Sequence, residues 1–181
     1  QGALLASAPL LFFLNSDTIA RPDWLNPMAK AFENDTVGIA GPKLLFPDEP
    51  EYGPAAGGIQ SCGGLFDAGK GPYHRYLGCK ADYKLANRAE VVSWITGAAQ
   101  MIRADLFRSL GGFDEGFKRG YFEDVDLCCR AKAKANMDTW YEPASVFVHA
   151  AGQSTSGKTD EQLKAAAWQF RANSYRFHAR W

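Results

Sequence analysis

Polar and acidic residues that could bind a metal or move a proton gather at two places along the 181-residue chain, and the first of these places follows an apolar run. Asn15, Ser16 and Asp17 come directly after the apolar residues 9–14. A carboxylate with neighbouring oxygens at the end of a buried strand suits a hard divalent cation that carries phosphates. The alternative is a purely structural role, because Asn-Ser-Asp-Thr is also typical of a turn.

The second acidic group is Glu123, Asp124 and Asp126, at the start of an expected helix. A helix N-terminus carries partial positive charge, so we expect these carboxylates to be held in their ionised forms. Asp124 lies three and four residues before Leu127 and Cys128, so it should project toward the sheet while Asp126 points elsewhere. An ionised carboxylate aimed at a cleft can act as a general base. The alternative is that the three acids only cap the helix.

His149 is the third candidate, because it follows the apolar residues 146–148 and precedes a polar loop that ends at Lys158. Imidazole is a common metal ligand, and a lysine can bind a diphosphate as a point charge. His149 is therefore a candidate metal ligand or phosphate contact, with Lys158 beside it. A lone histidine is more often an ordinary core or surface residue, so this alternative stays open.

The four cysteines, Cys62, Cys79, Cys128 and Cys129, form neither a CxxC pair nor a disulfide framework. Reduced thiols in a cytoplasmic protein are therefore expected. We expect the adjacent pair to be a small buried residue next to a partly exposed one, not a redox site.

The composition favours one globular domain over residues 1–181. Hydrophobic residues make up 46% of the chain and aromatic residues 13%, which excludes general disorder. The 20 basic and 20 acidic residues cancel, so the broad field that non-specific nucleic-acid binding exploits is absent, and we expect no nucleic-acid partner. The longest apolar stretch, Ala3–Leu14, is shorter than a bilayer needs and lacks the flanks of a signal peptide.

The elements that must position these residues follow an α/β pattern. The continuous apolar run of residues 9–14 predicts a strand covered on both faces, residues 22–32 a helix, and residues 37–40 a second strand. Such a βαβ unit predicts a layered α/β domain with a right-handed crossover. Residues 47–78, rich in Gly and Pro, predict a long loop with room for one hairpin.

The second half of the chain continues in short elements. We expect strands over 91–95, 100–103, 139–141 and 146–148, and helices over 105–110, 124–135 and 159–181. Thr159, followed by Asp160 and Glu161, should open the last helix. Its apolar residues recur at helical spacing from Leu163 to Trp181, which indicates core packing or a subunit contact in a homo-oligomer, with a membrane-surface role as the alternative.

Taken together, these segments resemble the inverting glycosyltransferases of family 2, which have the GT-A fold, and most of all the rhamnosyltransferase-like branch. The most specific part is Gly111–Glu115 followed by Glu123–Leu127 and Arg130, because order, spacing and residue types all agree. The first acidic site looks like the family's metal-binding strand end but lacks its first acid, which leaves Asp17 as the carboxylate. The other matching segments are Phe12–Thr18, Val37–Leu44, Trp94–Arg103 and Arg171–Phe177.

The resemblance implies a GT-A-like fold, a mixed, mostly parallel sheet flanked by helices, without the family's N-terminal donor-binding strands. It also implies a set of site residues. These are Asp124 and Glu123 for catalysis, Asp17 and His149 for a divalent metal (Mg²⁺ or Mn²⁺), Asn15, Ser16, Asp17 and Lys158 for the donor, and Trp94, Gly97 and Ala98 for the acceptor.

The activity that the resemblance implies is metal-dependent transfer of a sugar from a UDP- or dTDP-sugar to a glycan or lipid-linked acceptor, in polysaccharide biosynthesis for the cell envelope. Asp124 would take the acceptor's proton, and the acceptor oxygen would displace the diphosphate with inversion. The reaction would take place in the cytoplasm, at the inner face of the membrane. The alternatives are a non-catalytic carbohydrate-binding or assembly module, which would bind sugar without metal, and a metal-dependent nucleotidyltransferase.

Overall fold

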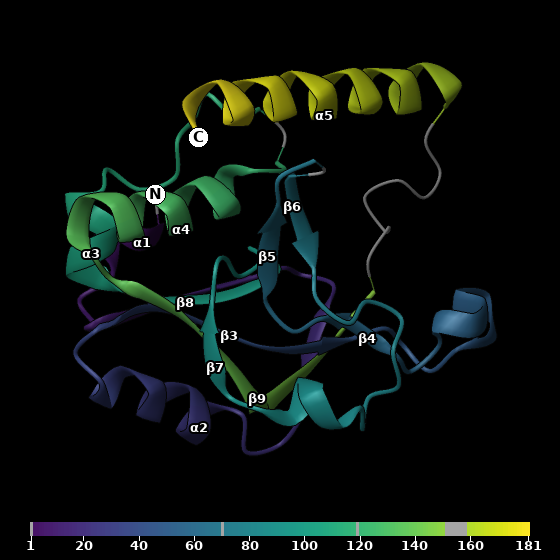
Figure 1. Ribbon diagram of the computed structural model, residues 1–181, viewed down its shortest axis with the longest axis horizontal. Coiled ribbons are helices and arrows are strands. Elements are labelled where there is room, and N and C mark those ends of the chain that lie inside the picture. The colour runs from purple at the N-terminus through teal and green to yellow at the C-terminus, as the bar shows by residue number, and fades with distance from the viewer. Residues whose placement is uncertain (1, 70, 119, 151–158) are drawn as a thin grey trace.

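A computed structural model describes residues 2–69, 71–118, 120–150 and 159–181. These residues form a central seven-stranded sheet with helices on both faces and a separate two-stranded hairpin (Figure 1). The strands of the sheet are β1 (Leu10–Leu14), β2 (Thr18–Ala20), β3 (Val37–Leu45), β4 (Ile59–Ser61), β7 (Glu90–Val92), β8 (Ala99–Arg103) and β9 (Asp138–His149). The hairpin consists of β5 (Gly64–Asp67) and β6 (Gly71–His74). The α-helices are α1 (Gly2–Leu5), α2 (Leu25–Lys30), α3 (Ala104–Ser109), α4 (Glu123–Ala135) and α5 (Asp160–Arg180), and 3-10 turns cover Ala31–Glu33, Pro50–Ala55 and Lys84–Asn87.

The sheet has the order β1-β8-β3-β9-β2, with β4 beside β3 and β7 beside β9. The α/β class and the mixed sheet are confirmed, but the expectation that the sheet is mostly parallel is wrong. Among the described pairs β3 and β9 are parallel, whereas the pairs β1–β8, β3–β8, β3–β4, β2–β9 and β7–β9 are antiparallel. The strands β1 and β3 of the predicted βαβ unit do run in the same direction, because β8 lies antiparallel between them.

Strand β1 is less covered than its sequence indicates. Leu11 is buried, whereas Leu14 is 46% exposed. A continuous apolar run is typical of a strand covered on both faces. In the described chain β1 ends the strand order, yet both of its faces are covered in part: Phe12 packs against Trp24 and Phe147, and Phe13, on the other face, packs against Phe107 and Phe113.

Alternating side chains of the central strands divide the core between the two faces. Ile39 and Ile102 belong to the cluster that packs against α3 and α4, whereas their neighbours Ala40 and Met101 pack against Met28 of α2. This is the two-residue period of a pleated strand. In Figure 1, α2 lies on one side of the sheet, with α3 and α4 on the other.

Strand β3 is longer than predicted, and every one of its residues is buried. A Cβ atom at Gly41 would lie 2.1 Å from a side-chain carbon of Ile95, so this close approach requires glycine. Lys43 is also buried because its ammonium group donates to Ala81 O at 3.2 Å and to the Asn87 side chain. The Gly-Pro-Lys sequence therefore interrupts the apolar pattern without ending the strand.

Two further boundaries differ from the prediction. The two short strands expected over 139–148 are one strand, β9, whose register against β3 shifts between Pro42 and Lys43. Proline lacks a backbone N–H, so the ladder cannot continue evenly there. The loop expected over 47–78 contains the predicted hairpin but also strand β4.

Helix α5 agrees closely with its predicted bounds. The side chains of Thr159 and Gln162 each accept a hydrogen bond from the other's backbone N–H, which makes a reciprocal N-terminal cap. Its apolar row is only partly buried: Phe177 is 2% exposed, whereas Phe170 is 45% exposed. In Figure 1, α5 lies on the outer side of the molecule next to the β5–β6 hairpin, and the Phe66 and Phe177 rings stack at 6.1 Å. Among the described residues, no helix has the length and apolar character needed to span a membrane.

Candidate active site

Strand pairing brings Asp17 and His149 together. The chain turns between β1 and β2, and β2 then pairs with the end of β9 so that Thr18 lies opposite His149. The backbone N–H of Ala150 donates to Asp17 O at 3.0 Å, and Asp17 Oδ1 lies 3.2 Å from His149 Nε2. Asp17 does occupy a turn, as the structural alternative predicted, but its carboxylate also faces the histidine.

The imidazole of His149 is largely buried and surrounded by polar groups. Burial lowers its pKa, while the nearby Asp17 carboxylate acts in the opposite direction. At neutral pH the ring is therefore mainly uncharged, the form that binds metals. Asn15 Nδ2 lies 3.4 Å from Nε2, so the side chain of Asn15 reaches the same ring nitrogen as Asp17. Ser16 is exposed in the turn beside them.

Gln60 is a contact of this site that sequence reasoning missed. Its side chain is within 2.6 Å of His149 Nδ1 and within 3.0 Å of the backbone oxygen of His149. Nothing in the local sequence of β4 connects Gln60 to a residue at the far end of the chain. The signal would have been a polar residue in an otherwise buried strand, because such a residue needs a partner.

Asp124 lies in the first turn of α4, where it accepts two backbone hydrogen bonds. Gly97 N–H donates to Oδ2 at 2.7 Å, and Val125 N–H donates to Oδ1 at 2.8 Å. Burial raises the pKa of Asp124, while these N–H groups and the Thr96 hydroxyl act in the opposite direction. The predicted direction of the side chain, toward the sheet, agrees with its contact to Gly97. The partial positive charge of the helix N-terminus acts to lower the pKa of Asp124, but the loss of hydration on burial outweighs this effect.

Glu123 departs further from the expected ionised state. Burial, with a smaller effect from the negative charge of Asp124, raises the pKa of Glu123 to about 7. Its buried Oε2 atom has no hydrogen-bond partner among the described residues. An anion at that atom would therefore be poorly stabilised, and of the two carboxyl groups Asp124 is the one equipped to carry negative charge.

The approach to α4 is strained. Gly120, Tyr121 and Phe122 have successive φ angles of 86°, 73° and 74°, in the left-handed region that favours glycine. Each non-glycine residue held there costs about 1–3 kcal/mol, and such residues cluster at functional sites. The ring of Phe122 packs against Phe170 and Phe177 of α5, which offsets the strain.

Residues 97 and 98 connect the two acidic sites. Ala98 O accepts a hydrogen bond from Asn15 N–H at 3.0 Å, and Gly97 N–H donates to Asp124. The structure thus places two of the three predicted acceptor-side residues between the candidate metal and base positions. Trp94, the third of these residues, does not lie between the two sites. It is 4% exposed, and its indole N–H donates to Leu65 O beneath the β5–β6 hairpin.

Asp126 anchors the end of α5. It contacts other groups than Asp124 does, as expected, but it is Asp126 that is fully buried, whereas Asp124 is only partly buried. It accepts hydrogen bonds from Arg130 Nε at 2.6 Å, Arg180 Nη1 at 2.8 Å and Trp181 Nε1 at 2.9 Å. Asp114 pairs with Arg180 as well, and its own backbone and arginine contacts lower its pKa strongly. This network fixes α5 beside the first turn of α4.

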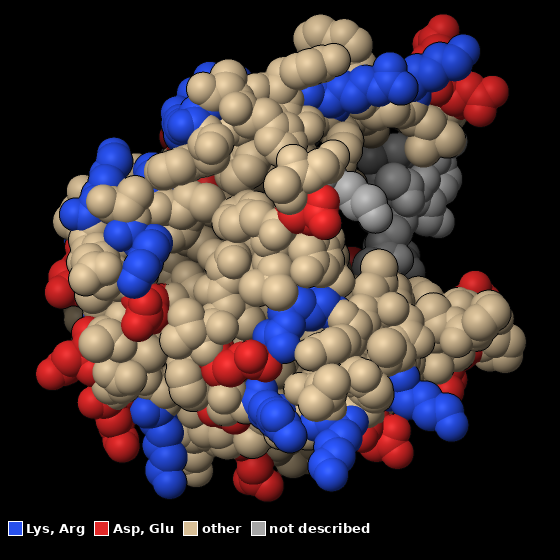
Figure 2. Space-filling model, viewed as in Figure 1, with Lys and Arg blue, Asp and Glu red and all other residues tan. Residues whose placement is uncertain are grey.

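Other predicted features fall outside this site. Lys158 and the loop between Ala150 and Thr159 lie outside the described residues. All four cysteines are free, and Cys128 is buried beside a partly exposed Cys129, as predicted. On the face shown in Figure 2, basic and acidic side chains are intermixed.

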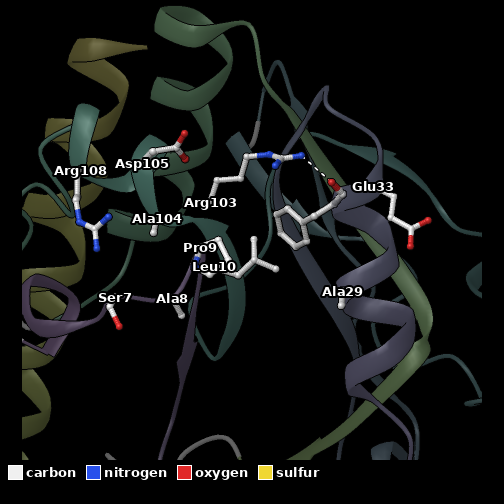
Figure 3. Close-up of a pocket in the computed structure, with 11 residues that line it drawn as sticks. Ser7, Ala8, Pro9, Leu10, Ala29, Glu33, Arg103, Ala104, Asp105 and Arg108 are labelled. Atoms are coloured by element: carbon white, nitrogen blue, oxygen red, sulfur yellow. Dashed lines mark hydrogen bonds between the residues drawn. The ribbon is translucent and has the colours of Figure 1, made fainter.

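A cavity of about 580 Å³ lies between α2 and α3. Figure 3 shows Arg103 reaching across it toward the segment of Glu33. Its guanidinium group donates to the carbonyl oxygens of Phe32 and Val37, each at 2.8 Å. None of the residues that line the cavity belongs to the predicted site, and Arg103 ties β8 to the end of α2.

The fold is shared with a known class of protein. The described architecture is similar to the crystal structure of GalNAc-T7 with UDP, GalNAc and Mn²⁺, with a TM-score of 0.57 over 82% of this chain and 29% of that chain, at 16% sequence identity. That neighbour is a GT-A glycosyltransferase, so the chain has the GT-A fold that its motifs predicted.

Sequence relatives agree with the fold, although no protein-family model matches the chain. It is 28% identical over 154 residues to the pre-mycofactocin glycosyltransferase of Mycobacterium tuberculosis, which covers 82% of this chain and 28% of the relative. It is 32% identical over 135 residues to the O-antigen biosynthesis protein RfbC of Myxococcus xanthus, covering 71% and 10%. It is 31% identical over 134 residues to the N-acetylglucosaminyl-diphospho-decaprenol L-rhamnosyltransferase of Mycobacterium tuberculosis, covering 71% and 42%. The chain is thus related to bacterial glycosyltransferases and spans less than half the length of each of these relatives.

Proposed function

We propose that the chain carries the catalytic and metal-binding residues of an inverting glycosyltransferase that uses a nucleoside-diphosphate sugar. The observation that carries this proposal is the arrangement of Asp17 and His149 on one side of residues 97–98 and Asp124 on the other. A glycosyl transfer needs a place for the departing diphosphate and a base for the incoming hydroxyl. The two sites supply these on neighbouring segments.

The donor set of the first site fits Mg²⁺ or Mn²⁺. A carboxylate oxygen and a neutral imidazole nitrogen 3.2 Å apart are ligands that such ions accept. Within the described chain, no group of three or more His, Cys, Asp or Glu residues is arranged to hold a metal. Asp17 and His149 would therefore hold the ion as a pair, with Asn15 beside them, and leave positions for phosphate oxygens. The chemistry that such an ion supplies when bound is neutralisation of the charge on the departing diphosphate.

Asp124 acts as the general base in this proposal. Its carboxylate accepts the proton of the acceptor hydroxyl as that oxygen forms a bond to the anomeric carbon. The bond from this carbon to the diphosphate breaks in the same displacement, so the anomeric configuration inverts. The raised pKa of Asp124 makes it a better proton acceptor than an ordinary aspartate. Glu123 keeps its own proton more readily and lowers the repulsion that a second anion would exert.

The names of the relatives guide the finer assignment of substrates and location. One relative is named for transfer of L-rhamnose to a decaprenol-linked acceptor, and the structural neighbour contains UDP. These names support our proposal that this chain takes a UDP- or dTDP-sugar donor and a glycan or lipid-linked acceptor, and we place the reaction at the inner membrane face. The outer face of α5, with Lys164, Trp168, Arg171 and Tyr175 at helical spacing, is the surface that we assign to membrane contact. Trp168 is 69% and Tyr175 78% exposed.

Calorimetric titration of UDP in the presence and absence of Mn²⁺ tests the proposal. Wild-type protein and the control Asp35→Ala should bind UDP only with Mn²⁺, because Asp35 is exposed at the opposite end of β3. Asp17→Ala and His149→Ala should each weaken this binding, and a chelator should abolish it. Equal binding by Asp17→Ala and wild type would contradict the shared site. Glycan binding that a chelator leaves unchanged, without UDP binding, would favour the carbohydrate-binding module.

A further inference from the structure

The side chain of Gln60, on β4, contacts His149, on β9, past the end of β3, which lies between these two strands. Strand β9 occupies one edge of β3, so β4, which also pairs with β3, lies on the other edge. His149 is one position beyond Val148, the last β9 residue paired with β3. The side chain of Gln60 therefore spans the end of β3, and Gln60 is 8% exposed.

Both ends of the Gln60 amide contact the same residue. Nε2 donates to the backbone oxygen of His149 at 3.0 Å, and Oε1 lies 2.6 Å from Nδ1 of the imidazole. The orientation of the amide follows from hydrogen-bond chemistry. The backbone oxygen of His149 can only accept a hydrogen bond, so it must face the NH₂ group of Gln60. The amide oxygen must then face Nδ1, and an oxygen there can only accept as well. The proton of a neutral His149 therefore sits on Nδ1.

We propose that Gln60 is a positioning residue that holds His149 as the Nδ1–H tautomer and aims the lone pair of Nε2 at Asp17. This inference rests on the proposed function, in which Nε2 is the atom that meets the metal. The backbone of His149 also pairs with Thr18, so the strand end has a second anchor besides Gln60. The group opposite a metal-bound nitrogen sets the tautomer and ring orientation in many metal sites, and its loss typically costs 10- to 100-fold in metal affinity.

Asp17 faces the other ring nitrogen, Nε2. Its Oδ1 atom lies 3.2 Å from Nε2, and a neutral ring with its proton on Nδ1 presents a second acceptor to that oxygen. Two acceptors that face each other repel unless a cation or proton lies between them. Asn15 Nδ2, 3.4 Å from Nε2, can donate to that nitrogen, but the contact between Nε2 and the Asp17 carboxylate becomes favourable only with a positive charge between them, which is the electrostatic condition for a cation site.

Nitrogen-15 spectra of the His149 ring at pH 8, without metal, test the tautomer directly. In wild-type protein and in the control Gln169→Leu, Nδ1 should show the protonated signature and Nε2 the unprotonated one. Gln60→Glu retains an acceptor for Nδ1–H and should keep this pattern. Gln60→Leu removes the acceptor and should give a mixture of tautomers or the Nε2–H form. A wild-type ring protonated on Nε2, or an unchanged pattern in Gln60→Leu, would overturn the inference.

Mn²⁺ titration of the same variants adds a second readout. Gln60→Leu should bind Mn²⁺ about 10- to 100-fold more weakly than wild type, and Gln60→Glu should recover most of the affinity. Should Gln60→Leu fail to fold, the comparison of wild type with Gln60→Glu still decides the tautomer. The predicted tautomers without Mn²⁺ binding would leave the role of Gln60 intact and refute the proposed metal site. Mn²⁺ binding together with the Nε2–H tautomer would refute the role of Gln60 and leave the proposed metal site intact.

Discussion

Asp124 is the residue whose removal should affect chemistry most and binding least. Asp124→Asn keeps the size of the side chain and an acceptor for Gly97 N–H, but it cannot take a proton. A general base typically contributes about 10²- to 10⁴-fold, so transfer should fall by that factor while UDP binding stays within a few fold. Initial rates with a panel of UDP- and dTDP-sugars measure this, with Asp105→Asn as an exposed control. Retention of more than about a tenth of the wild-type rate would exclude the general-base role.

Glu123 should make stability depend on pH. Its folded-state pKa of about 7 lies above the ordinary value of 4.5, so the folded protein prefers the protonated form. Stability is therefore lost as the pH rises from about 4.5 to 7, because the unfolded chain ionises first. Glu123→Gln mimics the protonated form and should match wild type at pH 4 but exceed its unfolding free energy by up to about 3 kcal/mol at pH 8.

Urea denaturation across this range, with exposed Glu115→Gln as the control, checks the prediction. A difference between Glu123→Gln and wild type that does not change with pH would contradict the assigned titration.

At the residue scale, the sequence indicated the candidate reactive groups but not their protonation states. Asp17, Asp124 and His149 could be recognised because each follows or precedes an element with a clear pattern. Gln60 could be recognised at most as a polar residue that needs a partner, because that partner lies on a strand far away in the chain. The raised pKa of Glu123 depends on burial by distant segments, so the local rule for helix termini gave the wrong direction.

Among the elements, α5 should depend on its connection to Asp126. Asp126→Ala removes the acceptor for Arg130, Arg180 and Trp181 and leaves Arg130, which is 6% exposed, without its partner. Removal of one partner of a buried ion pair costs about 3–5 kcal/mol. We expect a loss of that size in the unfolding free energy, measured in urea. Arg176→Ala breaks a pair at the surface and should cost about 1 kcal/mol or less. Equal losses of unfolding free energy in the two variants would show that the buried Asp126 contacts stabilise the protein no more than the surface pair does.

Helices were predicted more accurately than strands. The bounds of α4 and α5 follow from apolar spacing and from local capping, as at Thr159 and Gln162. The sequence predicts two strands in place of β9, because the middle residues of β9 are polar, small or proline, and it predicts that β3 ends before Gly-Pro-Lys. Both strands continue because a neighbouring strand satisfies their backbone groups, and this information is not local.

For the whole molecule, the sequence predicted the class but not the strand directions. The apolar run of β1 indicated a parallel sheet, whereas β8 inserts antiparallel between β1 and β3. Pairing of this kind is set by contacts over long sequence distances, which periodicity does not report. The resemblance of the motifs nevertheless predicted the GT-A fold, which the structural neighbour confirms.

The central claim is that a divalent cation binds between Asp17 and His149, next to the loop that holds Asp124. Paramagnetic broadening of backbone amide signals by Mn²⁺ tests it most directly. Broadening should be strongest for Asp17, Thr18 and His149, extend to Gln60 and Ala98, and spare residues such as Asp35 at the far end of β3. Asp17→Ala should abolish this pattern at the same Mn²⁺ concentration. Broadening centred elsewhere, or a pattern unchanged by Asp17→Ala, would contradict the account.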